Sequence, residues 1–287
     1  MRKKREAAGL QGRVPAAGMY SESIRGVEKD SPQNRVITAA IMEATRRRKW
    51  PAVEQALARA SPPNTIVYNA AMSAAIKCGQ PRRATELYET LCCEGLVRTL
   101  VTYVLAIRAF ARAGNYNKSV SIGHEMMSDA YVWQHVRPEE WEKQVESAYT
   151  ALVDAAGQAG NVTHAMDCLQ QFRKACDKPP SLVMFGAALN ACKNAKDAPA
   201  ARTLLADLRG SGHKPNIISY TTAMAAHRRR PLEEVKELVD EMRGDAVAPE
   251  KAFFEEHVAT LMSTDLPAVN LPATLAGLSQ ERLECLN

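Results

Sequence analysis

Residues that could do catalytic or metal chemistry are scattered along this chain rather than grouped. Its seven cysteines form no C-x-x-C pair, and no histidine stands beside them at zinc-ligand spacing. The six histidines are not spaced as metal pairs and no Gly-rich phosphate loop is present, so we expect each histidine at the surface or in a turn. The sequence therefore predicts no metal, no cofactor and no catalysis, and the odd cysteine count favours a reducing compartment.

Helices must position any functional side chain, because the chain repeats itself with a helical pattern. Hydrophobic residues make up 46% of the chain and aromatics only 6%, which favours closely packed helices over sheets. An aromatic residue followed by small and apolar residues recurs at spacings of 35, 46, 36, 35 and 34, at Tyr68, Tyr103, Tyr149, Phe185, Tyr220 and Phe254. An earlier, degenerate unit begins near Asn34, with Ile37 in the aromatic position. This period is typical of a solenoid of stacked hairpins.

Each unit has the pattern of a helix, a turn and a second helix. Gly79, Gly114 and Gly160 follow the first helices, where a left-handed residue is needed and glycine carries no Cβ penalty. Lys196 and Pro231 stand near that position in later units. We therefore expect those two turns to be built differently.

Apolar residues at helical spacing predict the seam between the two helices of each hairpin. They are Met72, Ile107, Val153, Leu189 and Met224 in the first helices, and Leu91, Met126, Phe172, Leu208 and Met242 in the second. A nearby position in the second helix is small in most units, which lets the helices cross closely: Ala84, Ser119, Ala165 and Ala201, with Val235 the exception. One hairpin cannot bury two apolar stripes alone, so the units must stack and leave a concave face.

One interval of the repeat carries an insertion of 11 residues, between Met127 and Tyr149. The run that begins at Pro138 continues with two glutamates, which is typical of a helix start. Part of the insertion should therefore lengthen the following first helix. We expect its aromatic residues to pack rather than to contact a ligand: Tyr131, Trp133 and Trp141.

The positive charge of the chain is concentrated at its start. The net charge is +5, yet residues 1–64 hold 13 Lys and Arg against 6 Asp and Glu, leaving 24 against 26 in the rest. Residues 1–33 begin basic, like an organellar targeting segment, but contain four acids that depart from that pattern. A targeting segment and a disordered basic tail both stay open. No run of about 18 apolar residues exists, so we expect no membrane partner.

The units resemble pentatricopeptide repeats. The resemblance is carried by Tyr68-Asn69 with Gly79, Ala84 and Gly95 after it, and by Lys214-Pro215-Asn216 before Tyr220. The competing tetratricopeptide repeat, which binds peptides, has a W-x-x-L-G-x-x-Y signature that no unit carries. The resemblance implies an all-α fold, a right-handed α-solenoid (superhelix) of antiparallel helix-turn-helix repeats.

The resemblance also implies how the chain is divided. Five repeats are expected, at 65–99, 100–145 with the insertion, 146–181, 182–216 and 217–250. Residues 34–64 should form a degenerate helical hairpin. Residues 251–287 should form a partial repeat and a C-terminal capping tail.

In the family, each unit addresses one base of single-stranded RNA, mainly through its fifth and last residues. Carried onto this sequence, the polar residues at those places are Thr38, Asn64, Asn69, Thr99, Thr150, Asn216, Thr221 and Glu250. Two other fifth places, Val104 and Gly186, offer no side-chain hydrogen bond, and the last place of the third repeat falls on Pro180 or Ser181.

The family's habit gives a short, gapped code. Thr38 with Asn64 would favour adenine, and Asn69 with Thr99 a pyrimidine. Thr150 and Thr221 would lean to purine. We therefore expect modest selectivity.

The second residue of a unit sandwiches a base in the family. Those places hold Ile66, Val101, Val183 and Ile218, with Ser147 the exception. Apolar side chains there could clamp a base by its faces. They could equally be ordinary buried aliphatic residues, and the sequence leaves both interpretations open.

A basic stripe recurs near the thirteenth residue of the units. It consists of Arg46, Lys77, Arg112, Lys193, Arg228 and Arg229, with Gln158 and Asn194 at the same place in two units. Such side chains could follow a phosphate backbone along the stack. Basic residues at helix C-termini also complement the helix dipole, which would explain the same positions without RNA.

The function implied by the resemblance is a single-stranded RNA-binding adaptor in organellar RNA processing, stabilisation, splicing or translation. It would act in the chloroplast or mitochondrion, with other RNA-processing or ribosomal proteins as further partners. Some family members end in a nuclease or zinc deaminase domain, but the residues after Met262 hold no H-x-E with a following C-x-x-C. The alternative is a protein-binding helical-repeat scaffold or a structural subunit of an organellar ribonucleoprotein, which the acidic body favours.

Overall fold

The computed structural model describes residues 31–60, 62–134 and 136–263. In these ranges the chain forms fourteen α-helices and one 3-10 helix, without any strand. The predicted all-α solenoid of helical hairpins is therefore confirmed. Most of the basic N-terminal segment and the C-terminal tail with Cys285 lie outside the described residues.

The chain divides into two compact units. Unit 1 falls within Met1–Ala155 and Gln171–Asp177, and unit 2 within Ala156–Gln170 and Lys178–Asn287. The helices of unit 1 are α2 (Pro32–Arg46), α3 (Trp50–Leu57), α4 (Thr65–Lys77), α5 (Pro81–Cys93), α6 (Leu100–Arg112), α7 (Tyr116–Ser128), α8 (Ala130–Gln134) and η2 (Pro138–Glu140). Those of unit 2 are α11 (Leu182–Ala195), α12 (Ala198–Gly210), α13 (Ile217–Ala226), α14 (Leu232–Gly244) and α15 (Lys251–Ser263). Two helices have residues in both units, α9 (Trp141–Ala159) and α10 (Val162–Ala175).

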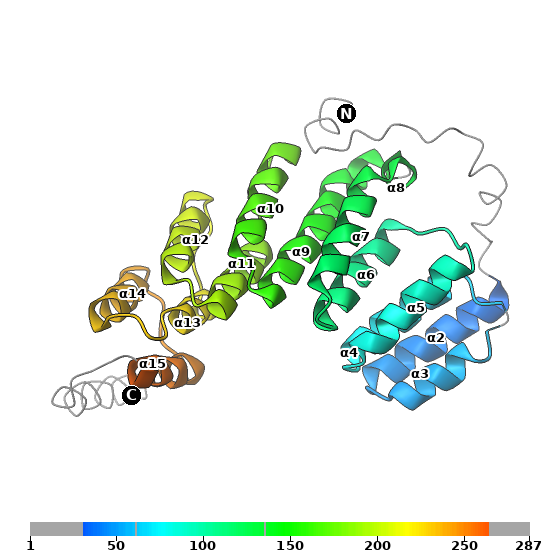
Figure 1. The fold of residues 1–287 in the computed structure, drawn as a ribbon, viewed down its shortest axis with the longest axis horizontal. Coiled ribbons are helices and arrows are strands. Elements are labelled where there is room, and N and C mark those ends of the chain that lie inside the picture. The colour runs from blue at the N-terminus through cyan, green and yellow to red at the C-terminus, as the bar shows by residue number, and fades with distance from the viewer. Residues whose placement is uncertain (1–30, 61, 135, 264–287) are drawn as a thin grey trace. The chain divides into compact units, whose positions relative to one another are not determined.

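Each unit has a layer of first helices and a layer of second helices. In unit 1 the first helices α2, α4 and α6 lie side by side, and each packs on its own second helix (Figure 1). In unit 2 the first helices α11, α13 and α15 follow one another in the same way. Successive hairpins thus contact through their first helices and also through the packing of one second helix on the next first helix, as α5 packs on α6.

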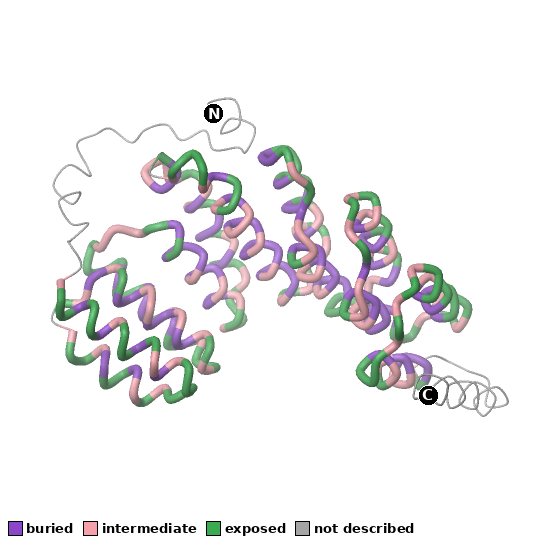
Figure 2. Tube along the Cα trace, turned by 180° about the vertical axis from the view of Figure 1, so that it is seen from behind, coloured by how far each residue is buried: buried purple, intermediate pink, exposed green. Residues whose placement is uncertain are grey.

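The predicted seam is the core of these hairpins. All ten apolar seam residues are buried, with exposed fractions of 0 or 1%. The position of the second helix that was predicted to be small is buried in the helix crossing as well. Its residues are all fully buried: Ala84, Ser119, Ala165, Ala201 and Val235. In Figure 2 the buried residues accordingly run along one side of each helix.

The turns between paired helices share one left-handed residue. Gly79, Gly114 and Gly160 have φ values of 74°, 83° and 69°. Lys196 adopts φ 57° in the same place, so the expectation that its turn is built differently was wrong. A lysine pays a steric cost of roughly 1–2 kcal/mol in this conformation, yet the same turn is kept. The Pro231 turn does differ, because α13 ends early at Ala226 and Arg229 takes the left-handed conformation.

The insertion packs as expected. The 3-10 helix η2 begins at Pro138 and leads directly into α9, which at 19 residues is longer than the other helices. Trp133 and Trp141 are 3% and 4% exposed, and their rings meet edge-on at 5.4 Å. The indole of Trp133 also donates to the Met126 carbonyl at 2.8 Å. The short helix α8 was not predicted.

The predicted surface location is wrong for two histidines. His227 is fully buried and His257 is 8% exposed. His227 Nδ1 donates to the Ala223 carbonyl at 2.7 Å, which satisfies one ring nitrogen inside its own helix. The spacing of histidines in the sequence could not show this, because it carries no information on burial.

The closed crossing at Ala201 leads to a stability prediction. We expect Ala201→Leu to lower the free energy of unfolding by roughly 1–3 kcal/mol, since three added carbons must displace a packed neighbour. Ala206 on the same helix is exposed, so Ala206→Leu should change stability by less than about 0.5 kcal/mol. Thermal or urea melts of both variants measure this. Equal melting curves would contradict the assigned crossing.

Candidate nucleic-acid interface

The last residue of several units is the N-cap of the next first helix. Asn64 Oδ1 accepts from Val67 N at 3.0 Å, and Asn216 Oδ1 accepts from Ser219 N at 2.9 Å. Thr99 caps α6 with a full capping box, in which its hydroxyl accepts from Thr102 N and Thr102 Oγ1 accepts from Thr99 N. Ser181 precedes α11 without a side-chain cap bond. Asn64, Thr99 and Asn216 therefore also determine where α4, α6 and α13 begin.

Asn69 and Thr99 lie together although 30 residues separate them. Asn69 Nδ2 donates to Thr99 Oγ1 at 3.5 Å, across the gap between α4 and the N-terminus of α6. Asn69 Oδ1 is buried and has no hydrogen-bond partner among the described residues. The same is true of Thr38 Oγ1 on α2. A buried acceptor without a donor is costly.

The other fifth places are occupied differently. Thr150 and Thr221 donate their hydroxyls to carbonyls one turn back, Glu146 at 2.6 Å and Ile217 at 2.8 Å. They therefore present only oxygen lone pairs outward, as acceptors. Val104 is 6% exposed and belongs to the core. At Gly186 an added Cβ would meet nothing within 4 Å, so this place is open.

The four second-place aliphatic residues are exposed. Ile66, Val101, Val183 and Ile218 have exposed fractions of 46%, 53%, 68% and 69%. The interpretation as ordinary buried aliphatic residues is therefore wrong. Each lies in the first turn of a first helix, three residues before the fifth place and on the same helix face. In unit 1 the pair Ile66 and Val101 brackets the bonded pair Asn69 and Thr99 along the chain.

The predicted basic stripe is divided between free and paired cations. Lys77, Arg112, Lys193 and Arg229 are exposed, and no ion pair joins any of them to another described residue. Arg228 is neutralised by Glu256 through two contacts of 2.8 and 3.0 Å, and Arg46 pairs with Glu43 at 3.2 Å. Asn194 serves packing instead, because its Nδ2 donates to the Gly157 carbonyl at 2.8 Å.

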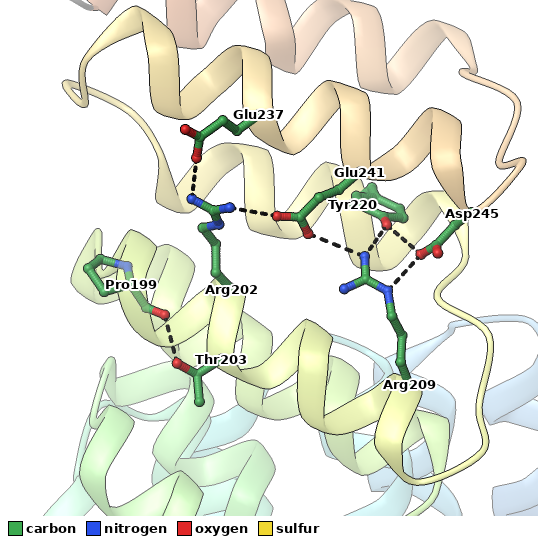
Figure 3. A network of polar contacts seen from close by, with 8 residues as sticks. All are labelled: Pro199, Arg202, Thr203, Arg209, Tyr220, Glu237, Glu241 and Asp245. Carbon is green, nitrogen blue, oxygen red and sulfur yellow. Dashed lines mark hydrogen bonds and ion pairs between the residues drawn. The ribbon is translucent and has the colours of Figure 1, made fainter.

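Several acids of the second helices form ion pairs with arginines of a neighbouring hairpin. Figure 3 shows how Arg202 of α12 bonds Glu237 and Glu241 of α14, at 2.6 and 2.8 Å. Arg209 reaches Glu241, Asp245 and the Tyr220 hydroxyl. In unit 1, Arg83 of α5 pairs with Glu54 of α3 at 3.2 Å. The acidic character of the body is thus partly neutralised within the second-helix layer.

A recurring tyrosine–carboxylate bond was missed at the sequence level. The hydroxyls of Tyr68, Tyr103 and Tyr220 donate to Glu94, Asp129 and Asp245, at 2.8, 3.0 and 2.5 Å. Each bond ties the start of a first helix to the end of its second helix, and burial together with the acid raises the pKa of each phenol. The signal was available as an acid 25 or 26 residues after the tyrosine. Phe185 has no hydroxyl, and Ser211 stands 26 residues after it.

Within the described ranges, no group of three or more His, Cys, Asp or Glu side chains is arranged to hold a metal ion. None of the described helices combines the length and the apolarity that crossing a bilayer requires.

Comparison with known families assigns these hairpins. The family model described as PPR repeat matches residues 66–96, 101–130 and 147–176, and the pentatricopeptide repeat domain model matches 176–230. The chain belongs to the pentatricopeptide repeat family. The matched segments include the first helices that carry Ile66, Val101, Val183 and Ile218.

Relatives within the pentatricopeptide repeat family are similar over part of their length. Two pentatricopeptide repeat-containing proteins of Arabidopsis thaliana are 27% identical over 195 residues and 22% identical over 183 residues. These alignments cover 66% and 63% of this chain but only 22% and 27% of the relatives. The chain therefore spans about a quarter of the length of the curated relatives that it matches.

Among solved structures, the chain is similar to the crystal structure of the pentatricopeptide repeat protein PPR10 from maize. The TM-score is 0.38 at 17% identity, covering 94% of this chain and 46% of that chain. For PPR10 in complex with an 18-nt psaJ RNA element, the TM-score is 0.39 at 15% identity, covering 88% and 43%.

Buried His227, at the C-terminal end of α13, predicts a pH-dependent stability of unit 2. Burial lowers the pKa of His227 below its usual 6.5, and the positive charges of Arg202 and Arg230 lower it further. The hydrogen bond to Ala223 and the negative charge of Glu234 oppose this shift. The folded state therefore binds a proton less readily than the unfolded state, and the free energy of unfolding should fall as the pH drops below about 6.5.

We expect His227→Gln to weaken this acid destabilisation in urea melts at pH 7.5, 6.5 and 5.5. The matched control is His124→Gln, because His124 is exposed on α7. A pH dependence of stability identical in the wild type and both variants would exclude His227 as its source.

Proposed function

We propose that this pentatricopeptide repeat chain is a single-stranded RNA-binding adaptor in which one hairpin addresses one base. The observation that carries the proposal is the exposure of Ile66, Val101, Val183 and Ile218. A single exposed aliphatic residue on a surface is ordinary. Four β-branched ones at the same place in four hairpins indicate a ligand with a repeated, flat, apolar face. The bases of an unpaired strand have that form.

The neighbouring polar groups support bases over peptide side chains as the ligand. Between Ile66 and Val101 lie the Asn69 amide and the Thr99 hydroxyl, which are bonded to each other and can address the polar edge of a base. Thr221 follows Ile218 by one helical turn and presents an acceptor. By the family's habit, Asn69 with Thr99 favours a pyrimidine and Thr221 a purine. Val104 and Gly186 would not discriminate between bases.

Electrostatics supports a polyanionic ligand on the first-helix layer. Several arginines of the second helices pair with acids of the same layer, whereas Lys77, Arg112 and Arg229, at or just after the ends of first helices, have no ion pair to another described residue. Cations in such positions can bind phosphates without regard to sequence.

The finer role is also a proposal. Family resemblance supports an organelle, chloroplast or mitochondrion, as the site of action, and processing, stabilisation, splicing or translation of a transcript as the task. RNA-processing or ribosomal proteins would then supply the remaining selectivity for the target transcript, because the selectivity of the repeats for bases is modest. The competing scaffold function predicts no binding of short single-stranded RNA even at low salt.

The exposed aliphatic residues give the first test of RNA binding. We expect Ile66→Ser with Val101→Ser to weaken binding of a short single-stranded RNA by about 1–2 kcal/mol, roughly fivefold to thirtyfold, because the base faces lose apolar contact. Thermal stability should hardly change, since both side chains are exposed. Fluorescence anisotropy and thermal melts measure the two effects.

The matched control is Val36→Ser with Met42→Ser, because these α2 residues are 70% and 55% exposed but occupy other places of the repeat. If both double variants bind RNA equally well, the second places do not hold bases.

The unpaired cations give a second test. Reversing Lys77, Arg112 and Arg229 to glutamate should weaken RNA binding and make it depend less on salt. Each phosphate contact on a single strand contributes about 0.7 to the slope of log K against log salt, so the slope should fall in magnitude by about 2. The control reverses three exposed cations of the second-helix side, Arg59, Lys174 and Lys236, and changes the net charge equally. An equal slope for both triple variants would remove the stripe from the mechanism.

A further inference from the structure

The turns of the first three hairpins in unit 1 have the same backbone conformation. A hydrogen bond closes each turn, from Lys49 N to the Ala44 carbonyl at 3.0 Å, from Gln80 N to Ala75 at 2.8 Å, and from Asn115 N to Phe110 at 2.9 Å. The residue before each donor is left-handed: Arg48, Gly79 and Gly114. Residues counted from these turns are therefore equivalent between hairpins.

An apolar layer holds the three turns at one edge of unit 1. Ala75, Ala84 and Ala109 are fully buried and pack together at the turn ends of α4, α5 and α6. Trp50, the first residue of α3, packs against the same cluster, as does Ile76. The turns after α2, α4 and α6 thus form one continuous border, which we call the turn edge.

The turn edge is densely basic. Its exposed cations without an ion pair to another described residue are Arg48, Lys49, Lys77, Arg82, Arg112 and Lys118. Three further arginines there already have carboxylate partners: Arg46 and Arg47 share Glu43, and Arg83 contacts Glu54 and Glu86. Only Lys77 and Arg112 belong to the basic stripe assigned above to the single strand. The other four cations have no role in the proposed function.

The charge density exceeds what one single strand needs. Neighbouring helices lie roughly 8–10 Å apart, so a strand with one base per hairpin brings one phosphate per about 10 Å. Six free cations over the about 20 Å between the first and third turns supply one per roughly 3–4 Å. A double helix carries about one phosphate per 1.7 Å of axis, and about half of them face one side. The density of the turn edge is therefore matched to a duplex.

We propose that the turn edge binds a double-helical RNA stem through its phosphates, beside the single strand held on the first helices. Double-stranded RNA is recognised mostly by shape and by backbone contacts, which a row of flexible lysines and arginines provides. The inference rests on the proposed function for the single strand, and it shares Lys77 and Arg112 with that site, whereas Arg48, Lys49, Arg82 and Lys118 serve the stem alone. An RNA with a stem next to an unpaired segment would occupy both sites.

The test compares three triple variants of the full chain that change the net charge equally. The edge variant carries Arg48→Glu, Arg82→Glu and Lys118→Glu, one in each hairpin. The single-strand variant carries Lys77→Glu, Arg112→Glu and Arg229→Glu, and the control carries Arg59→Glu, Lys174→Glu and Lys236→Glu. Anisotropy titrations at low salt use two probes, a blunt RNA hairpin with a stem of about 16 base pairs and an unpaired RNA of equal nucleotide count.

We expect the edge variant to bind the stem roughly tenfold or more weakly than the control does, while its affinity for the unpaired RNA stays within about twofold. Failure of the wild type to bind the stem, or equal stem binding by the edge and control variants, would overturn the stem site and leave single-strand binding standing. If the wild type binds the stem, the edge variant does not, and neither binds the unpaired RNA, the proposed function alone is refuted. Circular dichroism melts confirm that all variants are folded.

Discussion

The hydrogen bond that caps the first helices α2, α4, α6 and α13 fixes which residues lie on the exposed face of each of these helices. When Thr99 accepts from Thr102 N, the helix must begin at Leu100, and Val101 and Val104 take their places by helical periodicity. The capping residue also reaches back to Asn69 of the preceding hairpin. One polar side chain therefore sets the phase of a helix and joins two hairpins. A cap that slipped by one residue would rotate every candidate base contact by about 100°.

Periodicity in the sequence was enough to predict the hairpins, the buried seam and the small crossing positions. These features depend on contacts that recur in every unit, so each unit supplies an independent copy of the signal. Features that occur once were not predictable in the same way. The left-handed conformation of Lys196 contradicts its local preference, and it persists because the following helix is docked on the same seam as in other units. His227 is fully buried, which the sequence pattern of α13 does not reveal.

The candidate site stays a prediction in its position, and the structure adds which of its side chains are exposed or paired. Family resemblance indicated the second places, yet it could not decide whether Val183 and Ile218 were buried or exposed, because exposure depends on how the hairpins pack. It also could not distinguish Lys77 from Arg228, since both are basic near a helix end. The difference comes from Glu256 on α15, a residue 28 positions further along the chain. Tertiary ion pairs of this kind decide which charges remain available to a ligand.

Under the proposed function, the pairing of acids with arginines would explain how a chain with a slightly acidic body could hold a polyanion. An acid that is bonded to an arginine contributes little field at a distance, because the two charges cancel beyond a few ångströms and salt screens the remainder within about 8–10 Å. Glu237 and Glu241 are paired with Arg202 and Arg209 in this way. The unpaired cations at the ends of first helices lack such cancellation, and their field is not opposed locally. Under the proposed function, the positions of the unpaired cations, rather than the sum of charges, would therefore decide where an RNA backbone binds.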